Sequence, residues 1–227
     1  MGHRHRVGLL VPSSDTVMEA DLWRRVPNEC VLHVARMYME STTVAGEAKM
    51  LQEELAPAAH RIASVHPELV VFGCTSAAAL EGLDGDAAIA SRVEAIAGCR
   101  CVTVVQAALR EIRELRVQRL LVVTPYVAEI NDRLEQTFVE AELPVTGVVG
   151  MGLDDDLDIA AVPPEEVRRF VLGAARGDIP PPDCVFVSCT TFRALEVAED
   201  LEGELGIPVL TSNRGALQAI LRHLGGE

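Results

Sequence analysis

Two segments, one in each half of the chain, place a cysteine in nearly the same surroundings. Residues 70–81 read VVFGCTSAAALE and residues 185–196 read VFVSCTTFRALE, so Cys74 and Cys189 coincide when the segments are aligned without a gap. If the two halves pack face to face, one thiol can act as a base or nucleophile while the other donates a proton. We therefore predict that Cys74 and Cys189 are the catalytic residues.

Hydroxyl and phenol groups follow several apolar runs and are suited to binding a substrate. In a parallel sheet, ligands bind beyond the carboxyl ends of the strands, where helix N-termini present free N–H groups. A thiolate at such a terminus is expected to be stabilised. For Ser14 and Asp15 the alternative role is to cap the following helix. The predicted substrate-binding residues all lie at such ends and are Ser13, Ser14, Asp15, Thr75, Ser76, Tyr126, Thr190 and Thr191.

Other groups with chemical potential favour structural roles. Residues 154–156 are three consecutive aspartates, which we interpret as an exposed acidic loop and helix cap, because consecutive residues cannot all face one metal ion. Residues 211–213 (TSN) are expected to cap the final helix or to line the site. No GxGxxG, GxxxxGK[ST] or GxSxG pattern occurs, so we predict no nucleotide cofactor and no metal. The remaining cysteines are expected to be reduced and structural: Cys30, Cys99, Cys101 and Cys184.

The composition argues against several classes of partner. The chain has 227 residues, a net charge of −14 and 49% apolar residues. This charge disfavours nucleic acid and anionic membranes as partners. The apolar stretch after the basic residues 3–6 is too short for a signal peptide, and no apolar run is long enough to span a membrane. We expect a cytoplasmic protein, and the overall charge does not argue against a small anionic substrate, which local backbone N–H groups can hold.

Short apolar runs alternate with helical patterns, which predicts an α/β fold with parallel sheets. We predict two pseudo-symmetric lobes, each a four-stranded parallel sheet flanked by helices, with the active site in the cleft between them. The lobes are expected to cover residues 1–116 and 117–227, and a crossover of the C-terminal helix to the first lobe is left open. The predicted strands are 6–11, 31–37, 69–72, 101–105, 119–123, 145–149, 184–187 and 209–211. The clearest predicted helices are 43–64, 106–115, 128–141 and 164–175.

The paired cysteine segments resemble those of the aspartate/glutamate racemase superfamily. Within it, the segments GLLVPSSDT, FGCTSA, TPYVAEIN, MGL with its acidic loop, and SCTTFRALE look most like maleate cis-trans isomerases, with arylmalonate decarboxylases as close relatives. The resemblance implies a cofactor-independent reaction. The thiolate of Cys74 would add to the double bond of maleate, Cys189 would donate a proton, and the new single bond would rotate before elimination releases fumarate. Tyr126 and the donors beside the cysteines would hold the two carboxylates, and a homodimer is one assembly that the resemblance suggests.

The sequence departs from this family pattern at Asp15, where maleate isomerases have asparagine. A carboxylate facing a substrate carboxylate is repulsive unless it is protonated or a cation is present. This departure keeps open a two-thiol racemase of an acidic or N-substituted amino acid. A small-acid binding protein is a further alternative, which the two thiols disfavour. A decarboxylase is disfavoured because the resemblance puts glycine at the position of Cys74 in those enzymes.

Overall fold

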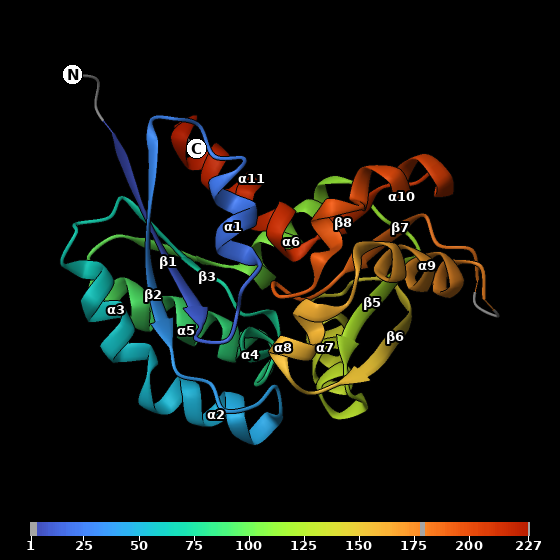
Figure 1. Cartoon of the computed structure of the whole chain (residues 1–227), viewed down its shortest axis with the longest axis horizontal. Coiled ribbons are helices and arrows are strands. Elements are labelled where there is room, and N and C mark those ends of the chain that lie inside the picture. The colour runs from blue at the N-terminus through green and yellow to red at the C-terminus, as the bar shows by residue number, and fades with distance from the viewer. Residues whose placement is uncertain (1–3, 178–179, 227) are drawn as a thin grey trace.

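The computed structural model describes residues 4–177 and 180–226, which form two parallel four-stranded sheets flanked by helices (Figure 1). The strands are β1 (His5–Pro12), β2 (Cys30–Met37), β3 (Leu69–Phe72), β4 (Arg100–Thr103), β5 (Leu120–Tyr126), β6 (Val145–Leu153), β7 (Cys184–Val187) and β8 (Val209–Thr211). The helices are α1 (Met18–Trp23), α2 (Val44–Glu53), α3 (Leu55–Ala63), α4 (Thr75–Ala78), α5 (Gly82–Ala97), α6 (Val104–Glu114), α7 (Ala128–Glu140), α8 (Asp156–Ala161), α9 (Pro164–Ala175), the 3-10 helix η1 (Arg193–Glu196), α10 (Ala198–Leu205) and α11 (Ser212–Leu224).

The two sheets have equivalent strand orders, which confirms the predicted two-lobe α/β fold. The first sheet runs β2-β1-β3-β4 and the second runs β6-β5-β7-β8, with every neighbouring pair parallel. In both sheets the strand that leads to a cysteine, β3 or β7, lies third in this order. Every residue of these two strands is buried, as expected for strands covered by helices on both faces. The order therefore brings Cys74 and Cys189 to corresponding strand ends.

Side-chain caps fix where several helices begin. Thr103 accepts a hydrogen bond from the backbone N–H of Gln106, and the Gln106 side chain accepts one from the N–H of Thr103, so the pair forms a capping box at α6. This cap ends the strand at Thr103, two residues before the end of the predicted strand 101–105. Thr43 and Thr211 cap α2 and α11 in a similar way, each accepting from the N–H three residues later.

The predicted helix 43–64 is two helices in the structure. Glu54, with φ −108° and ψ −23°, leaves regular helical geometry between α2 and α3. The periodic apolar pattern continues across this residue, so the sequence pattern does not reveal the break. The short helices α1, α4 and α8 were expected only as segments that follow a cap or a strand end, without predicted bounds, because each has only four to six residues and shows too little periodicity.

The lobes share apolar packing and are not simply tethered. Phe138 of α7 lies 5.6 Å, ring centroid to centroid, from Phe186 of β7, and both belong to a core that also contains Ile89 and Val93 of α5 in the first lobe. The C-terminal helix α11 returns to the first lobe, where it lies beside α1 and α6 (Figure 1). Its residue Ile220 packs in the same core as the β1 and β3 side chains.

Candidate active site

Cys74 lies directly after β3, at the N-cap position of the single-turn helix α4. Gly73 precedes it, and a side chain there would collide with the sulfur of Met18 on α1. This close approach explains why a very small residue comes before the cysteine. The Cys74 Sγ lies 3.7 Å from the Ser76 hydroxyl, and the thiol is only 4% exposed. The structure therefore places the predicted nucleophile at a strand-to-helix corner, closed off from solvent.

Cys189 occupies the matching strand end but a different local geometry. Its φ of 113° lies in the left-handed region that residues with a side chain rarely adopt, and it is followed by a loop rather than a helix. The prediction that both thiols lie at helix N-termini is therefore wrong for Cys189. The strained corner is held by hydrogen bonds from the N–H of Ser188 to the Val123 carbonyl (2.8 Å) and from the N–H of Cys189 to the Ser212 hydroxyl (3.1 Å). Such strain persists only where the surrounding structure enforces it and is concentrated at functional sites.

Ser212 joins the two cysteine segments. Its hydroxyl accepts from the Cys189 N–H and lies 2.9 Å from the Thr75 hydroxyl. Because the Ser212 oxygen is already an acceptor, its own proton is free to be donated to Thr75. The two segments are thus linked through one buried side chain at the start of α11. The prediction for residues 211–213 left capping and lining the site as alternatives, and the structure shows Thr211 as the cap and Ser212 between the two segments.

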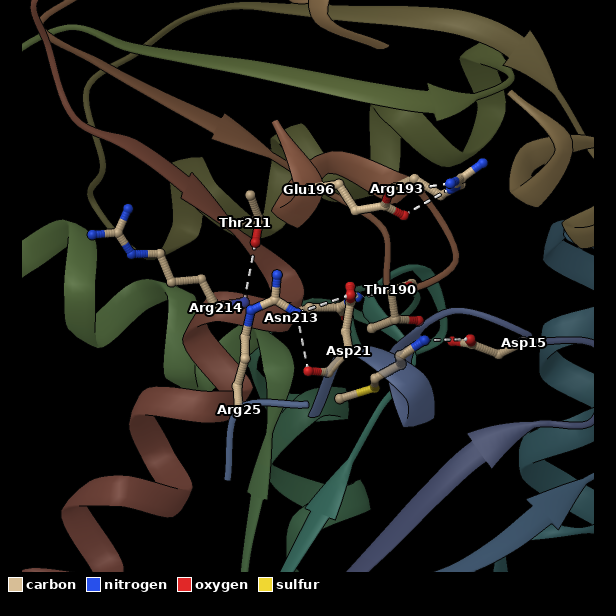
Figure 2. Close-up of polar contacts among 10 residues, drawn as sticks. Asp15, Asp21, Arg25, Thr190, Arg193, Glu196, Thr211, Asn213 and Arg214 are labelled. Carbon is tan, nitrogen blue, oxygen red and sulfur yellow. Dashed lines mark hydrogen bonds and ion pairs between the residues drawn. The ribbon is translucent and has the colours of Figure 1, made fainter. Parts of the chain in front are cut away.

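Asn213 fixes the turn after Cys189. Its side-chain amide donates to the Thr190 carbonyl and to Asp21, each at 2.9 Å, as Figure 2 shows. Asp21 also pairs with Arg25 at 3.2 Å and is itself buried. The Thr190 hydroxyl in turn donates to the Gly73 carbonyl (3.4 Å). The residues on either side of the two cysteines therefore hold each other in place.

Tyr126, at the end of β5, is the neighbour that the two thiols share. Its hydroxyl interacts with the Cys189 sulfur and lies near enough to both thiols for their charges to raise its pKa. Burial is the largest cause of this increase, which takes the pKa well above its usual range. Tyr126 is 2% exposed. A neutral phenol here can donate to a thiolate or to a substrate oxygen.

Asp156 brings a carboxyl to the site from α8. It accepts hydrogen bonds from the Ser14 hydroxyl (2.6 Å) and the Thr42 hydroxyl (3.0 Å), both from the first lobe. Burial raises its pKa, the two hydroxyls oppose this rise, and the charge of Asp15 adds to it. The prediction of an exposed acidic loop is therefore wrong for Asp156, which is 5% exposed, because the polar partners come from segments far away in sequence. Asp155 does cap α8, as expected.

Asp15 caps α1 and also lies close to the Cys189 segment. One carboxyl oxygen accepts from the N–H groups of Val17 (2.8 Å) and Met18 (2.9 Å) at the start of α1. The other oxygen has no hydrogen-bond partner within the described residues. Burial raises the pKa of Asp15, and the nearby hydroxyls of Thr190 and Thr191 oppose this rise. The carboxyl therefore caps a helix and faces the Cys189 segment at the same time.

A third buried carboxyl, Glu47 on α2, was not predicted. It is fully buried, and neither of its oxygens has a hydrogen-bond partner within the described part of the chain. Burial raises its pKa from 4.5 to about 8, the charge of Asp156 adds to this rise, and the Ser76 hydroxyl opposes it. A charged residue on an amphipathic helix is usually exposed, so the sequence alone offers no signal for this position.

Burial, rather than helix capping, dominates the acidity of both thiols. The pKa of Cys74 lies well above its usual range because of burial and the charges of Glu47 and Asp156. The pKa of Cys189 is raised by burial and by Asp156 and Asp15, while Tyr126 opposes the rise. Proximity of Cys74 to a one-turn helix does not offset these effects. Both resting thiols are therefore protonated and need a base to become nucleophilic.

The remaining predicted residues also lie around these groups. The Ser13 hydroxyl accepts from the N–H of Met39 (3.2 Å), which ties the loop after β1 to the segment after β2.

No set of three or more His, Cys, Asp or Glu side chains among the described residues is arranged to hold a metal ion. No helix in the described ranges is long and apolar enough to cross a membrane. Of the other cysteines, Cys30, Cys101 and Cys184 are buried and Cys99 is half-buried.

Comparisons with known proteins agree on one family. Residues 7–227 match the family model described as arylmalonate decarboxylase. The chain is 29% identical over 236 residues to a maleate isomerase of Nocardia farcinica (strain IFM 10152), covering 99% of this chain and 91% of the relative. It is 25% identical over 220 residues to an arylmalonate decarboxylase of Bordetella bronchiseptica, covering 97% and 90% of the two chains.

Solved structures show the same fold. A cysteine-to-serine variant of Nocardia farcinica maleate cis-trans isomerase, with a covalently bound succinylcysteine intermediate, superposes with a TM-score of 0.86 at 26% identity, covering 99% of this chain and 94% of that one. The maleate isomerase of Pseudomonas putida S16 with maleate superposes with a TM-score of 0.88 at 20% identity, covering 97% and 92% of the two chains. At this identity the second likeness concerns the fold alone.

Proposed function

Because the chain belongs to the arylmalonate decarboxylase and maleate isomerase family of the aspartate/glutamate racemase superfamily, we propose that it is a cofactor-independent cis-trans isomerase of a small unsaturated dicarboxylic acid, of the maleate-to-fumarate kind. The observation that carries the proposal is the arrangement of two buried thiols, Cys74 and Cys189, around one buried phenol, Tyr126. A protein that only binds a small acid has no need for two such nucleophiles.

The proposed reaction uses the thiols in different roles. The Cys74 thiolate adds to one carbon of the double bond and forms a C–S bond, while the electron pair of the double bond takes a proton from Cys189 at the neighbouring carbon. The resulting single bond rotates. The Cys189 thiolate then removes the proton, the C–S bond breaks, and the trans acid leaves. The covalently bound succinylcysteine in the Nocardia farcinica enzyme supports an addition step of this kind.

Donor groups around the thiols would hold the two substrate carboxylates. Tyr126, Thr75, Ser76, Thr190 and Thr191 offer hydroxyl groups, and a preorganised set of such donors stabilises charge that develops during addition. Ser13 and Ser14 hold the loop after β1 in place. The Ser13 hydroxyl accepts from the Met39 N–H, and the Ser14 hydroxyl donates to Asp156.

The aspartate at position 15 is compatible with an anionic substrate when it is protonated. Burial raises the pKa of Asp15, and one of its oxygens has no hydrogen-bond partner among the residues that the structure describes, so a neutral carboxyl there can donate a hydrogen bond as an asparagine amide does. A neutral carboxyl at this position would remove the repulsion that a dianion would otherwise meet.

The test is proton NMR of the reduced protein with maleate in deuterated buffer. Growth of the fumarate signal in the wild type, and its absence in Cys74→Ala and Cys189→Ala, is the expected result. Turnover that survives loss of either thiol would exclude the two-thiol mechanism, and an unchanged maleate signal in the wild type would exclude maleate as the substrate.

One observation favours a second candidate, a racemase of an acidic or N-substituted amino acid. Asp15, Glu47 and Asp156 surround the thiols, and no Lys, Arg or His contributes to the interactions described for these carboxyls. If they are ionised, they suit a substrate that carries an ammonium group. Exchange of the α-proton of aspartate or glutamate for deuterium, without change in maleate, is the result that this candidate predicts.

A further inference from the structure

Glu47 is a buried carboxyl beside the site that the proposed reaction leaves without a role. It lies on the first turns of α2, is 0% exposed, and has two oxygens without hydrogen-bond partners among the described residues. An ionisable group in such a position is costly for stability. Its position beside a reactive thiol therefore indicates a role other than packing.

The Ser76 hydroxyl is a neighbour of both Cys74 and Glu47. Its oxygen is 3.7 Å from the Cys74 sulfur, and it also acts on the Glu47 carboxyl, although neither oxygen of Glu47 meets full hydrogen-bond geometry. The charge of Glu47 is the largest effect on Cys74 after burial. A hydroxyl in this place can accept a proton from one neighbour while donating its own to the other.

The other two carboxyls near the thiols are less free to exchange a proton with Cys74. Both oxygens of Asp156 accept hydrogen bonds, from Ser14 and Thr42. Asp15 uses one oxygen to cap α1, and its charge affects Cys189 rather than Cys74. Glu47 alone of the three has both oxygens open and lies on the Cys74 side of the site.

We propose that Glu47 is a positioning residue that takes up the proton of Cys74 through the Ser76 hydroxyl. As the S–H bond of Cys74 breaks, its proton passes to the Ser76 oxygen, and the Ser76 proton passes to the Glu47 carboxylate. This leaves a Cys74 thiolate, an unchanged serine and a neutral carboxyl, with no net change in protons or charge. The reverse transfer restores the resting thiol when the C–S bond breaks. The proposal rests on Cys74 being the nucleophile of the proposed function.

The pH dependence follows from the groups around Glu47. Cys74 and Ser76 face it from the segment after β3, Asp156 faces it from α8, and its charge also reaches Tyr126 on β5. Glu47 can accept a proton only when it is ionised, and burial raises its pKa to about 8. Activation of Cys74 is therefore expected to increase as the pH rises through about 8.

The first experiment needs no substrate. The rate of Cys74 alkylation by iodoacetamide is followed against pH by peptide mass spectrometry in the wild type, Glu47→Gln, Glu47→Asp and Glu111→Gln. Glu111 on α6 is the matched control, because it is also buried and has one oxygen without a partner, but lies away from the thiols. The proposal predicts that Glu47→Gln slows alkylation about 100-fold near pH 8, which is the lower end of the rate loss expected when a general base is removed. Glu47→Asp should restore part of this rate. Glu111→Gln should alkylate at the wild-type rate.

A purely electrostatic role for Glu47 predicts the opposite sign. Its charge raises the pKa of Cys74, so its removal would make the thiolate more abundant and alkylation faster. Faster or equal alkylation in Glu47→Gln, or a wild-type Cys74 that stays unreactive above about pH 8, overturns the proposal. These outcomes are distinct from a failure of the proposed isomerase, which is judged by fumarate formation alone.

A double-mutant cycle tests the path through Ser76. If Glu47 acts through this hydroxyl, then Ser76→Ala and the double variant Glu47→Gln/Ser76→Ala lower the alkylation rate by nearly the same factor as Glu47→Gln alone. Factors that multiply in the double variant would show two independent effects and would exclude the relay.

Discussion

Replacement of Glu47 by glutamine is expected to change how the stability of the fold depends on pH. Burial raises the pKa of Glu47 from 4.5 to about 8, so the folded protein holds a proton there that the unfolded chain has released. Between these two values the folded state binds more protons than the unfolded state, and the free energy of unfolding falls as the pH rises. This loss of stability is complete above about pH 8 and absent below about pH 4.

The size of the effect follows from the two pKa values. Ionisation of the unfolded chain at the Glu47 position lowers the free energy of unfolding by about 1 kcal/mol near pH 5 and by about 3 kcal/mol near pH 7. The difference between the two conditions, about 2 kcal/mol, should disappear in Glu47→Gln. Glutamine keeps the shape of the side chain and cannot ionise, so the variant should gain stability relative to the wild type as the pH increases.

Urea unfolding at about pH 5 and about pH 7, followed by circular dichroism, measures this difference. Glu53→Gln removes an exposed carboxyl at the end of the same helix and gives the baseline for the loss of one negative charge from α2. If wild type and Glu47→Gln lose the same stability between the two pH values, Glu47 is not a neutral buried acid. In that case both the pH argument and its use as a proton acceptor near pH 8 would be wrong.

Three further outcomes are expected. Cys74→Ala and Cys189→Ala should each abolish turnover in the NMR assay with near-wild-type melting temperatures, whereas Cys99→Ala should retain activity; a reversed pattern would mean that other cysteines do the chemistry. Asp156→Ala removes the acceptor of two first-lobe hydroxyls and should lower the free energy of unfolding in urea by about 1–3 kcal/mol, and an unchanged value would show that these contacts contribute nothing. Ser212→Ala leaves the N–H of Cys189 without its acceptor and should lower kcat at least about tenfold, while the affinity for a dicarboxylate changes little. Equal losses of kcat and of affinity would contradict the role of Ser212 in holding the Cys189 corner.

The alternation of short apolar runs with helical patterns was enough to predict the fold, because apolar runs and their spacing determine buried parallel strands. The positions of Tyr126, Thr75 and Thr190 just after predicted strands indicated that they would lie near the thiols, since the carboxyl ends of parallel strands meet at one edge of a sheet. These are properties of short segments, and one sequence displays them directly.

The parts that escaped prediction depend on contacts between distant segments. Glu47 and Asp156 look like surface residues on short helices, and contacts with segments far away in sequence bury them. The left-handed geometry of Cys189 likewise results from hydrogen bonds to Val123 and Ser212, which lie 66 and 23 residues away in sequence. No local propensity marks such a residue, because cysteine has no preference for this conformation.

The path of α11 limits how freely the two repeated halves can be exchanged. Ser212 and Asn213 hold the Cys189 corner, yet the rest of the same helix packs on the first lobe through Ala216 and Ile220. A fragment ending near Arg116 would expose the apolar surface that α11 covers, and the complementary fragment would carry a helix with an uncovered apolar side. Neither half can therefore be complete before α11 has been synthesised, and a chimera that swaps halves between relatives must carry α11 with the first lobe that it covers.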